Sequence, residues 1–227
     1  MSFRLQVFTL LAIALLPLRA SSLPDEVKTA LDAYRTEGPK GWAFVQSTVG
    51  EDKQLVESYD PLQPDHQKWT LVSKDNRPPT SSEINSYRQQ QTRRTGGETA
   101  PNVKNQLDHD SFELASDDGT RAQWRFRLVP GAHDDTSAEH MAATFTFHRP
   151  TQTIERVELA SFESFSPVFA VNIDEARTVL EYSLPSDNRP SLLQRITVRV
   201  RGRAFLFKSL DSDMTVSYSE YTFAGKS

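Results

Sequence analysis

Two sets of side chains in this sequence have the types and spacing of a ligand-binding surface. The first set is aromatic and recurs at every second position, at Trp124, Phe126, Phe145, Phe147, Phe205 and Phe207. Because successive side chains of a β-strand point to opposite faces, each pair lies on one face of its strand. Ligand sites are mostly concave and apolar, so these rings could line a cavity for a lipid or an acyl chain. Alternatively, they fill an ordinary packed core beneath helices.

Arginines at alternating positions form the second set. They are Arg121, Arg125 and Arg127 in one segment and Arg195, Arg199, Arg201 and Arg203 in a later one. If the two segments are neighbouring strands, they form a cationic patch of guanidinium groups, which bind phosphate and carboxylate well. The arginines predicted to hold a head group at the rim of the cavity are Arg125, Arg127, Arg199 and Arg201. Alternatively, the arginines lie on a solvated outer face and pair with Glu155, Glu158 and Glu181.

No catalytic or metal-binding pattern accompanies these two sets. The sequence has no Gly-x-Ser-x-Gly, no His-Glu-x-x-His and no glycine-rich phosphate loop. His133-Asp134-Asp135 with His140 could hold a divalent cation, but the spacing matches no established site, so a polar surface loop is the favoured interpretation. We predict no catalytic residue, no metal and no cofactor, with an unrecognised hydrolase as the alternative.

The first twenty residues have the three parts of a secretory signal peptide. Arg4 gives a positive start, an apolar run follows at Leu5–Leu16, and Pro17 ends it. The run is shorter than the roughly 20 residues of a spanning helix, which argues against the alternative of an uncleaved N-terminal anchor. We therefore expect cleavage before Ser21 and release into the periplasm. The sequence contains no cysteine, so an N-terminal lipid anchor and structural disulfides are excluded.

Composition favours one mildly acidic domain over residues 21–227. Loss of residues 1–20 removes Arg4 and Arg19, which leaves 24 of the 26 bases against 30 acids and changes the net charge from −4 to −6. Nucleic acid selects for basic proteins, so we expect no nucleic-acid partner. No later segment has the apolar length of a spanning helix, so we expect a chain that does not span a membrane.

Two helices and many short strands must position these side chains. The first helix is expected from Pro24 to Gly38-Pro39, with an apolar stripe along Val27–Tyr34. The second follows Thr80, which forms a capping-box pattern with Glu83. Strands are expected at Trp42–Val49, Gln54–Tyr59, Lys68–Ser73, 120–129, 141–148, 153–162, 179–184, 195–201, Ala204–Leu210 and 214–219.

Short turns join most of these strands, and short connections force antiparallel pairing. One such turn is expected at Arg201-Gly202, whereas residues 92–110 lack periodicity and are predicted to form a flexible loop. The fold class that follows is mainly β (α+β), with a single large, strongly curved antiparallel sheet of 10–11 strands. Such a sheet is a half-open β-barrel, and the two helices are expected to cover it.

This order of elements resembles the lipoprotein-carrier superfamily of bacterial periplasms, which includes the LolA, LolB and RseB types. The resemblance covers residues 24–223 and is carried by Val27–Tyr34, the first two strands, the helix from Thr80, and the run from Arg121 to Phe223. It implies a half-open sheet whose apolar concave face accommodates acyl chains.

The function we expect is that of an exported, non-enzymatic periplasmic protein that binds a lipid or a lipid-modified partner. The alternative is an interaction or sensor module of the cell envelope. Its core would be filled, and its sheet edge or the 92–110 loop would recognise another envelope protein.

The signal peptide gives a first testable prediction. Protein secreted by an exporting host should begin at Ser21, because signal peptidase cleaves after a small residue such as Ala20. Intact-mass spectrometry of the purified protein measures this directly. A mass that corresponds to a chain still beginning at Met1 would contradict the prediction and support an uncleaved anchor.

Overall fold

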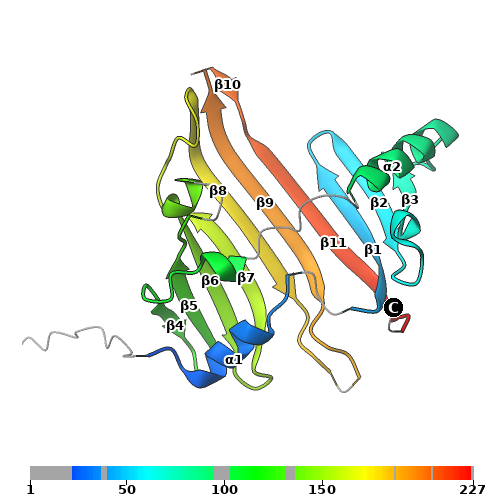
Figure 1. Ribbon diagram of the computed structural model, residues 1–227. Coiled ribbons are helices and arrows are strands. Elements are labelled where there is room, and N and C mark those ends of the chain that lie inside the picture. Colours follow the sequence, from blue (N-terminus) through cyan, green and yellow to red (C-terminus); the bar gives the residue numbers. More distant parts are fainter. Residues whose placement is uncertain are drawn as a thin grey trace, which may run out of the picture.

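The computed structural model describes residues 22–36, 40–94, 103–130, 136–186, 188–205 and 207–225. Within them the chain forms one eleven-stranded sheet and two α-helices (Figure 1). The helices are α1 (Asp25–Ala33) and α2 (Ser81–Arg94), with 3-10 helices η1 (Asp65–Gln67), η2 (Val103–Gln106) and η3 (Thr136–His140). The strands are β1 (Trp42–Gly50), β2 (Lys53–Tyr59), β3 (Trp69–Lys74), β4 (Glu113–Asp117), β5 (Arg121–Arg127), β6 (Met141–His148), β7 (Thr153–Ser161), β8 (Val171–Tyr182), β9 (Leu193–Ala204), β10 (Lys208–Ser209) and β11 (Ser212–Phe223).

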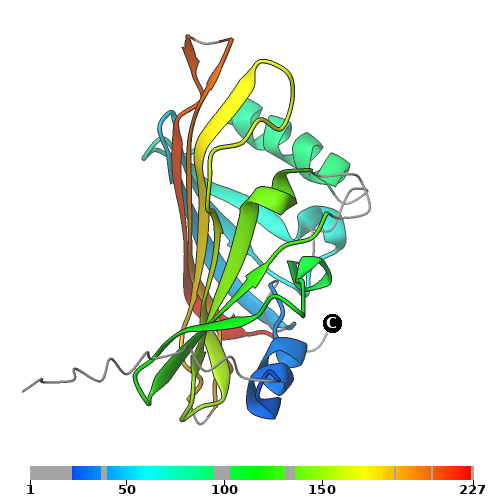
Figure 2. The same ribbon diagram turned by 90° about the vertical axis from the view of Figure 1, so that its left-hand side faces the viewer.

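The sheet is antiparallel and open, as the sequence predicted. Its strand order is β3-β2-β1-β11-β9-β8-β7-β6-β5-β4, with β10 paired to β9, so β3 and β4 are the two free edges. Seen from the side, the sheet curves and carries both helices on its concave face (Figure 2). Residues 1–20 and 133–135, for which a signal peptide and a possible metal loop were predicted, lie outside the described residues.

Alternating polarity decides which side chains face the helices. In β5, Ala122, Trp124 and Phe126 are buried and the residues between them are more exposed. Cross-strand pairing extends this concave-facing set across the sheet. One row runs through Trp124, Phe145, Val157, Leu180, Ile196, Val216, Thr48 and Leu55.

Helix α1 covers the β5–β7 half of the concave face. Val27, Ala30 and Leu31 form its buried stripe and pack into the main core cluster. The helix ends at Ala33, earlier than the predicted end at Gly38. Tyr34 leaves helical geometry, packs edge-on against Phe145 at 5.9 Å, and its hydroxyl bonds that of Tyr182 at 2.7 Å. These tertiary contacts outweigh the further helical turn that local sequence would allow.

Helix α2 begins with the predicted capping box. The Glu83 N–H donates to Thr80 Oγ1 at 3.3 Å, and the Thr80 N–H donates to Glu83 Oε2 at 2.8 Å. Arg77 also binds the Glu83 carboxylate and, with the Thr80 N–H, holds its pKa well below the usual range.

The β1–β3 half of the concave face has its own packing beneath α2. The Tyr87 hydroxyl donates to Glu57 Oε1 at 2.7 Å, and Gln46 Nε2 donates to Glu57 Oε2 at 3.1 Å, so this buried carboxylate is satisfied. Beside them, the ring of Phe44 lies 4.9 Å from Tyr59 and 5.5 Å from Tyr218. Hydrogen bonds and stacked rings therefore tie this half of the sheet together.

Other local predictions were also wrong. Of the predicted loop 92–110, residues 95–102 lie outside the described part of the chain. The described ends are not loop, because α2 continues to Arg94, and Val103 and Leu107 are buried in the core. Arg201-Gly202 is not a turn, because β9 continues to Ala204. Gly202 is required for close packing, since a Cβ there would lie 2.5 Å from the Asn172 carbonyl oxygen of β8. The described turn residues Phe205 and Phe207 lie instead between β9 and β10.

Burial predicts how two phenylalanines differ in their contribution to stability. Phe126 is fully buried, so Phe126→Ala should lower the free energy of unfolding by about 3–5 kcal/mol. Phe207 is 87 % exposed, so Phe207→Ala should change it by no more than about 0.5 kcal/mol. Urea denaturation followed by circular dichroism measures both values. Equal losses would show that the core is not where we place it.

Candidate functional site

Four of the six predicted cavity residues lie in a packed core. Trp124, Phe126, Phe145 and Phe147 are at most 3 % exposed and belong to the cluster that α1 covers. The Phe126 and Phe145 rings meet edge-on at 5.8 Å. The alternative interpretation, a filled core beneath a helix, describes these four rings.

The other two predicted cavity residues are elsewhere. Phe205 is 63 % exposed and Phe207 is 87 % exposed, at the turn that follows β9. The prediction that they share an apolar face with the other four was wrong. It assumed a strand from Ala204 to Leu210, in which period-two alternation would have aligned the rings.

The predicted arginine patch does not form, because β5 and β9 are separated by β6, β7 and β8. Arg125 pairs with Glu113 of β4 at 3.1 Å. Arg199 and Arg201 both pair with Asp213 of β11, and together they lower the pKa of that carboxyl. Arg127 is exposed on the same convex face of β5.

The convex face carries ion pairs with Glu155, Glu158 and Glu181, the acids named by the alternative interpretation. Two of the predicted arginines take part, because Arg121 pairs with Glu155 and Arg195 lies 3.8 Å from Glu181. Arg156 and Arg177, which the prediction did not include, bind the remaining acid positions. Arg156 bonds Glu181 at 3.0 Å and Glu158 at 3.1 Å, and Arg177 bonds Glu158 at 2.9 Å. Burial alone would raise the pKa of Glu158, but hydrogen bonds from Arg177 and Arg156 outweigh it and lower the pKa. Most of these arginines are therefore engaged with acids on neighbouring strands.

The middle of the concave face is apolar and only half-buried. Its side chains come from the two central strands and are Ile196, Val198 and Val200 of β9 and Met214 of β11. Helix α1 lies against β7 and α2 against β3, and neither α-helix crosses the middle of β9 and β11 (Figure 1). The sequence analysis did not predict this surface. Ile196, Val198 and Val200 do alternate with polar residues, but the predicted cavity was built from aromatic residues alone.

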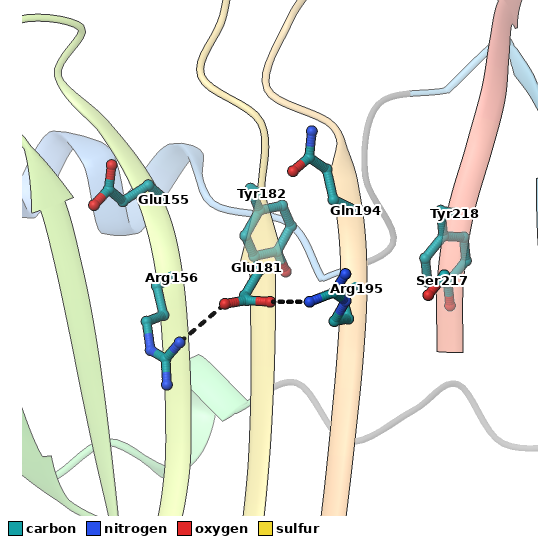
Figure 3. A pocket seen from close by; sticks show the side chains of 8 residues that line it. All are labelled: Glu155, Arg156, Glu181, Tyr182, Gln194, Arg195, Ser217 and Tyr218. Atoms are coloured by element: carbon teal, nitrogen blue, oxygen red, sulfur yellow. Dashed lines mark hydrogen bonds and ion pairs between the residues drawn. The ribbon is translucent and has the colours of Figure 1, made fainter. Parts of the chain in front are cut away.

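A cavity of about 520 Å³ lies where β9 and β11 separate (Figure 3). Their pairing stops at Arg195 and Ser217, and beyond that point β11 continues against β1 alone. Side chains from both faces of the sheet therefore reach the cavity. Its lining is Glu155, Arg156, Glu181, Tyr182, Gln194, Arg195, Ser217 and Tyr218.

The cavity offers hydrogen-bond donors and a partly free cation. Arg195 lies 3.8 Å from Glu181 and its side chain is 57 % exposed, so most of its five N–H donors remain available. Glu155 and Glu181 are held by Arg121 and Arg156. The arrangement suits a small anionic group, which Arg195 would bind.

Tyr182 and Tyr218 line this cavity, and burial keeps their hydroxyls and those of two nearby tyrosines protonated. Burial raises the pKa of Tyr218 to about 12, with the Glu57 charge as a smaller cause. Burial also raises the pKa of Tyr182, Tyr34 and Tyr221. The Tyr221 hydroxyl donates to the Leu193 carbonyl at 2.5 Å and so bridges the separated ends of β9 and β11. These hydroxyls can donate hydrogen bonds but are not anions at neutral pH.

The described part of the chain contains neither a cluster of metal-binding side chains nor a helix that could span a membrane. No three His, Asp or Glu side chains there are placed to hold a metal ion. His140 bonds Glu163 at 2.8 Å and His148 bonds Thr151 at 2.8 Å. Neither α1, α2 nor any other described helix has the length and apolarity to cross a bilayer.

Comparison with known proteins yields little. No family model and no curated protein matches this chain. Among solved structures, GphF Dehydratase 1 is 12 % identical with a TM-score of 0.19, over 88 % of this chain and 83 % of that one. An isomerase-inactive variant of that dehydratase is 11 % identical with a TM-score of 0.18, over 88 % and 80 % of the two chains. At TM-scores this low, the likeness carries no argument.

The raised pKa of Tyr218 predicts a pH dependence of stability. An unfolded tyrosine ionises near pH 10, whereas folded Tyr218 ionises only at about 12. As the pH rises through this window, the unfolded state loses its proton first, so the free energy of unfolding falls. In Tyr218→Phe this contribution is absent, and the fall between about pH 10 and 12 should be shallower.

Urea denaturation of both proteins, at a series of pH values from about 8 to 12, checks this. Below about pH 9 the two stability curves should run parallel, because the group is protonated in both states. Curves that remain parallel up to about pH 12 would contradict the burial of the Tyr218 hydroxyl.

Proposed function

We propose that this chain is an exported, non-enzymatic protein of the periplasm that binds an apolar chain along the middle of its concave face. The chain would belong to a lipid or to a lipid-modified partner protein. The observation that carries the proposal is the half-buried apolar surface of Ile196, Val198, Val200 and Met214, which neither α-helix covers. Contiguous apolar surface that a fold leaves open is typical of binding sites.

The length and direction of this surface suit an acyl chain. From Ile196 to Val200 the strand rises about 13 Å, and each CH₂ group buried there would contribute about 0.8 kcal/mol. Arg195 leaves β9 on the face opposite to Ile196, at the point where β9 and β11 separate and the cavity opens. An anionic head group that enters this opening would bind at Arg195 while its chain follows β9 on the concave face.

A relationship to the lipoprotein-carrier superfamily is part of this proposal. An open, curved antiparallel sheet with helices on its concave face is the architecture that the resemblance implies. Fold alone does not decide function, so the proposal depends on the open apolar surface and not on this likeness.

The interaction module is the second candidate, and two observations favour it. The β5–β7 half of the concave face is filled by α1. All five residues of the edge strand β4 are exposed, and an open edge can pair with a strand of another protein. In this case the partner would bind at the edge, and the middle of the concave face would stay empty.

A pair of adjacent substitutions distinguishes the two candidates. Val198→Arg places a charge on the concave face, and Thr197→Arg places the same charge on the convex face one residue away. Val198→Arg should weaken binding of dansyl-labelled undecanoic acid roughly tenfold or more, because the cation cannot be desolvated beside the chain. Thr197→Arg should bind the probe as the wild type does.

Fluorescence titration gives both affinities, and thermal melting confirms that the variants are folded. Lipid mass spectrometry of protein purified from its native envelope would identify a natural ligand. If the folded wild-type protein is purified without bound lipid and binds no probe, the lipid-binding proposal is contradicted and the interaction module is favoured. Equal affinities of the two variants would show that the chain binds elsewhere.

A further inference from the structure

Four large apolar side chains are exposed together at one end of the sheet. Phe169 is 98 % exposed, Phe207 87 %, Phe205 63 % and Val168 62 %. Val168 and Phe169 precede β8, and Phe205 and Phe207 belong to the turn between β9 and β10. We call these four residues the aromatic tip.

Backbone hydrogen bonds bring the two loops of the aromatic tip together. The Phe205 N–H donates to the Ala170 carbonyl at 2.8 Å, and Val171 pairs with Ala204 where β8 and β9 meet. The turn after β9 forms the end of the sheet farthest from α1 (Figures 1 and 2). The two loops therefore form one protrusion at this end of the sheet, and their four apolar side chains are exposed there.

The backbone of the tip is held in a conformation that few such residues adopt. Ala170 has a φ of 62° and Phe205 a φ of 52°. Positive φ is rare for residues other than glycine and is an outlier for a bulky side chain such as phenylalanine. The loop that carries Val168 and Phe169 is nevertheless held against the sheet. Its Phe165 is buried, pairs with Ile173 and stacks on the His140 ring at 5.2 Å. Strained backbone conformations cluster at functional sites, so a strained loop that exposes apolar rings to solvent indicates a function.

We propose that the aromatic tip docks this protein on a lipid bilayer by inserting its phenylalanine rings into the interfacial region. Aromatic rings partition well into the membrane interface. Arg203 and Lys208, which flank the turn, are exposed, and long cationic side chains can reach head-group phosphates from such positions.

The size and shape of the tip favour a bilayer over a protein partner. A stable protein interface takes roughly 20–30 residues from each side and requires complementary shape. Four residues on one protrusion fall far short of that, whereas insertion into a bilayer requires no matching surface. The proposal does not depend on ligand binding, because it uses none of the concave-face residues.

Docking by the tip would also orient the concave face. Strand β9 runs from the cavity near Leu193 to the tip at Phe205, and Ile196, Val198 and Val200 lie between them. An apolar chain leaving the bilayer at the tip would meet this surface next.

Vesicle flotation tests the proposal. The protein secreted by an exporting host should float with vesicles of phosphatidylethanolamine and phosphatidylglycerol. The triple variant Phe169→Ser, Phe205→Asn and Phe207→Ser should lower the partition coefficient roughly tenfold or more, because three rings no longer leave water. Asparagine is chosen at position 205 because it tolerates positive φ. Leu62→Ser, at an exposed residue outside the tip, should float as the wild type does.

Tryptophan fluorescence gives a second test, with a substitution that should leave the fold intact because Phe207 is exposed. In Phe207→Trp, vesicles should shift the tryptophan emission to the blue relative to the same variant without vesicles, and brominated lipids should quench the shifted emission. Failure of the wild type to float, or equal flotation of the triple variant, would overturn the proposal. Wild-type flotation without an emission shift in Phe207→Trp would overturn it too, because the protein would then contact lipid elsewhere. A wild type that instead captures a protein through the tip would assign the surface to that partner and equally overturn it.

Discussion

The concave face of this sheet is wider than its helices can cover. Ten strands in one hydrogen-bonded path span roughly 43 Å, since neighbours lie about 4.8 Å apart. The nine residues of α1 measure only about 13.5 Å, and the fourteen of α2 about 21 Å. Each helix therefore buries one side of the face, and the middle of β9 and β11 keeps its apolar side chains half in water. The proposed chain-binding surface is a direct consequence of this mismatch.

The two covered sides are stabilised in different ways. Beneath α1, close-packed aromatic rings such as Phe126 and Phe145 exclude water. Beneath α2, the buried Glu57 carboxylate accepts hydrogen bonds from Tyr87 and Gln46, beside the stacked rings of Phe44 and Tyr59. No cysteine is present, so these contacts and the continuous strand pairing must hold the open sheet without a covalent link.

The two ends of β9 have opposite chemistry. At Leu193 and Arg195 the strand leaves β11 and borders a cavity lined mainly by tyrosine, arginine and glutamate side chains. At Phe205 it ends in exposed aromatic rings. Between the ends, the convex side carries arginines paired with acids and the concave side carries aliphatic residues. One strand thus connects a polar cavity, an apolar surface and a hydrophobic tip.

Local sequence determined the elements, and tertiary structure decided which of them meet. The alternation of Trp124 and Phe126 with arginines predicted β5 and its two faces, and Thr80 with Glu83 predicted the start of α2, because periodicity and capping depend on residues close in the chain. Strand order depends on long-range pairing, so the sequence could not show that three strands separate the arginines of β5 from those of β9. Nor could it show that Gly202 accommodates a neighbouring strand, which moves the turn to Phe205 and exposes its ring. The aromatic residues were predicted as one surface, but only the packing of α1 decided that four of them are core, and only the end of β9 decided that two of them face solvent.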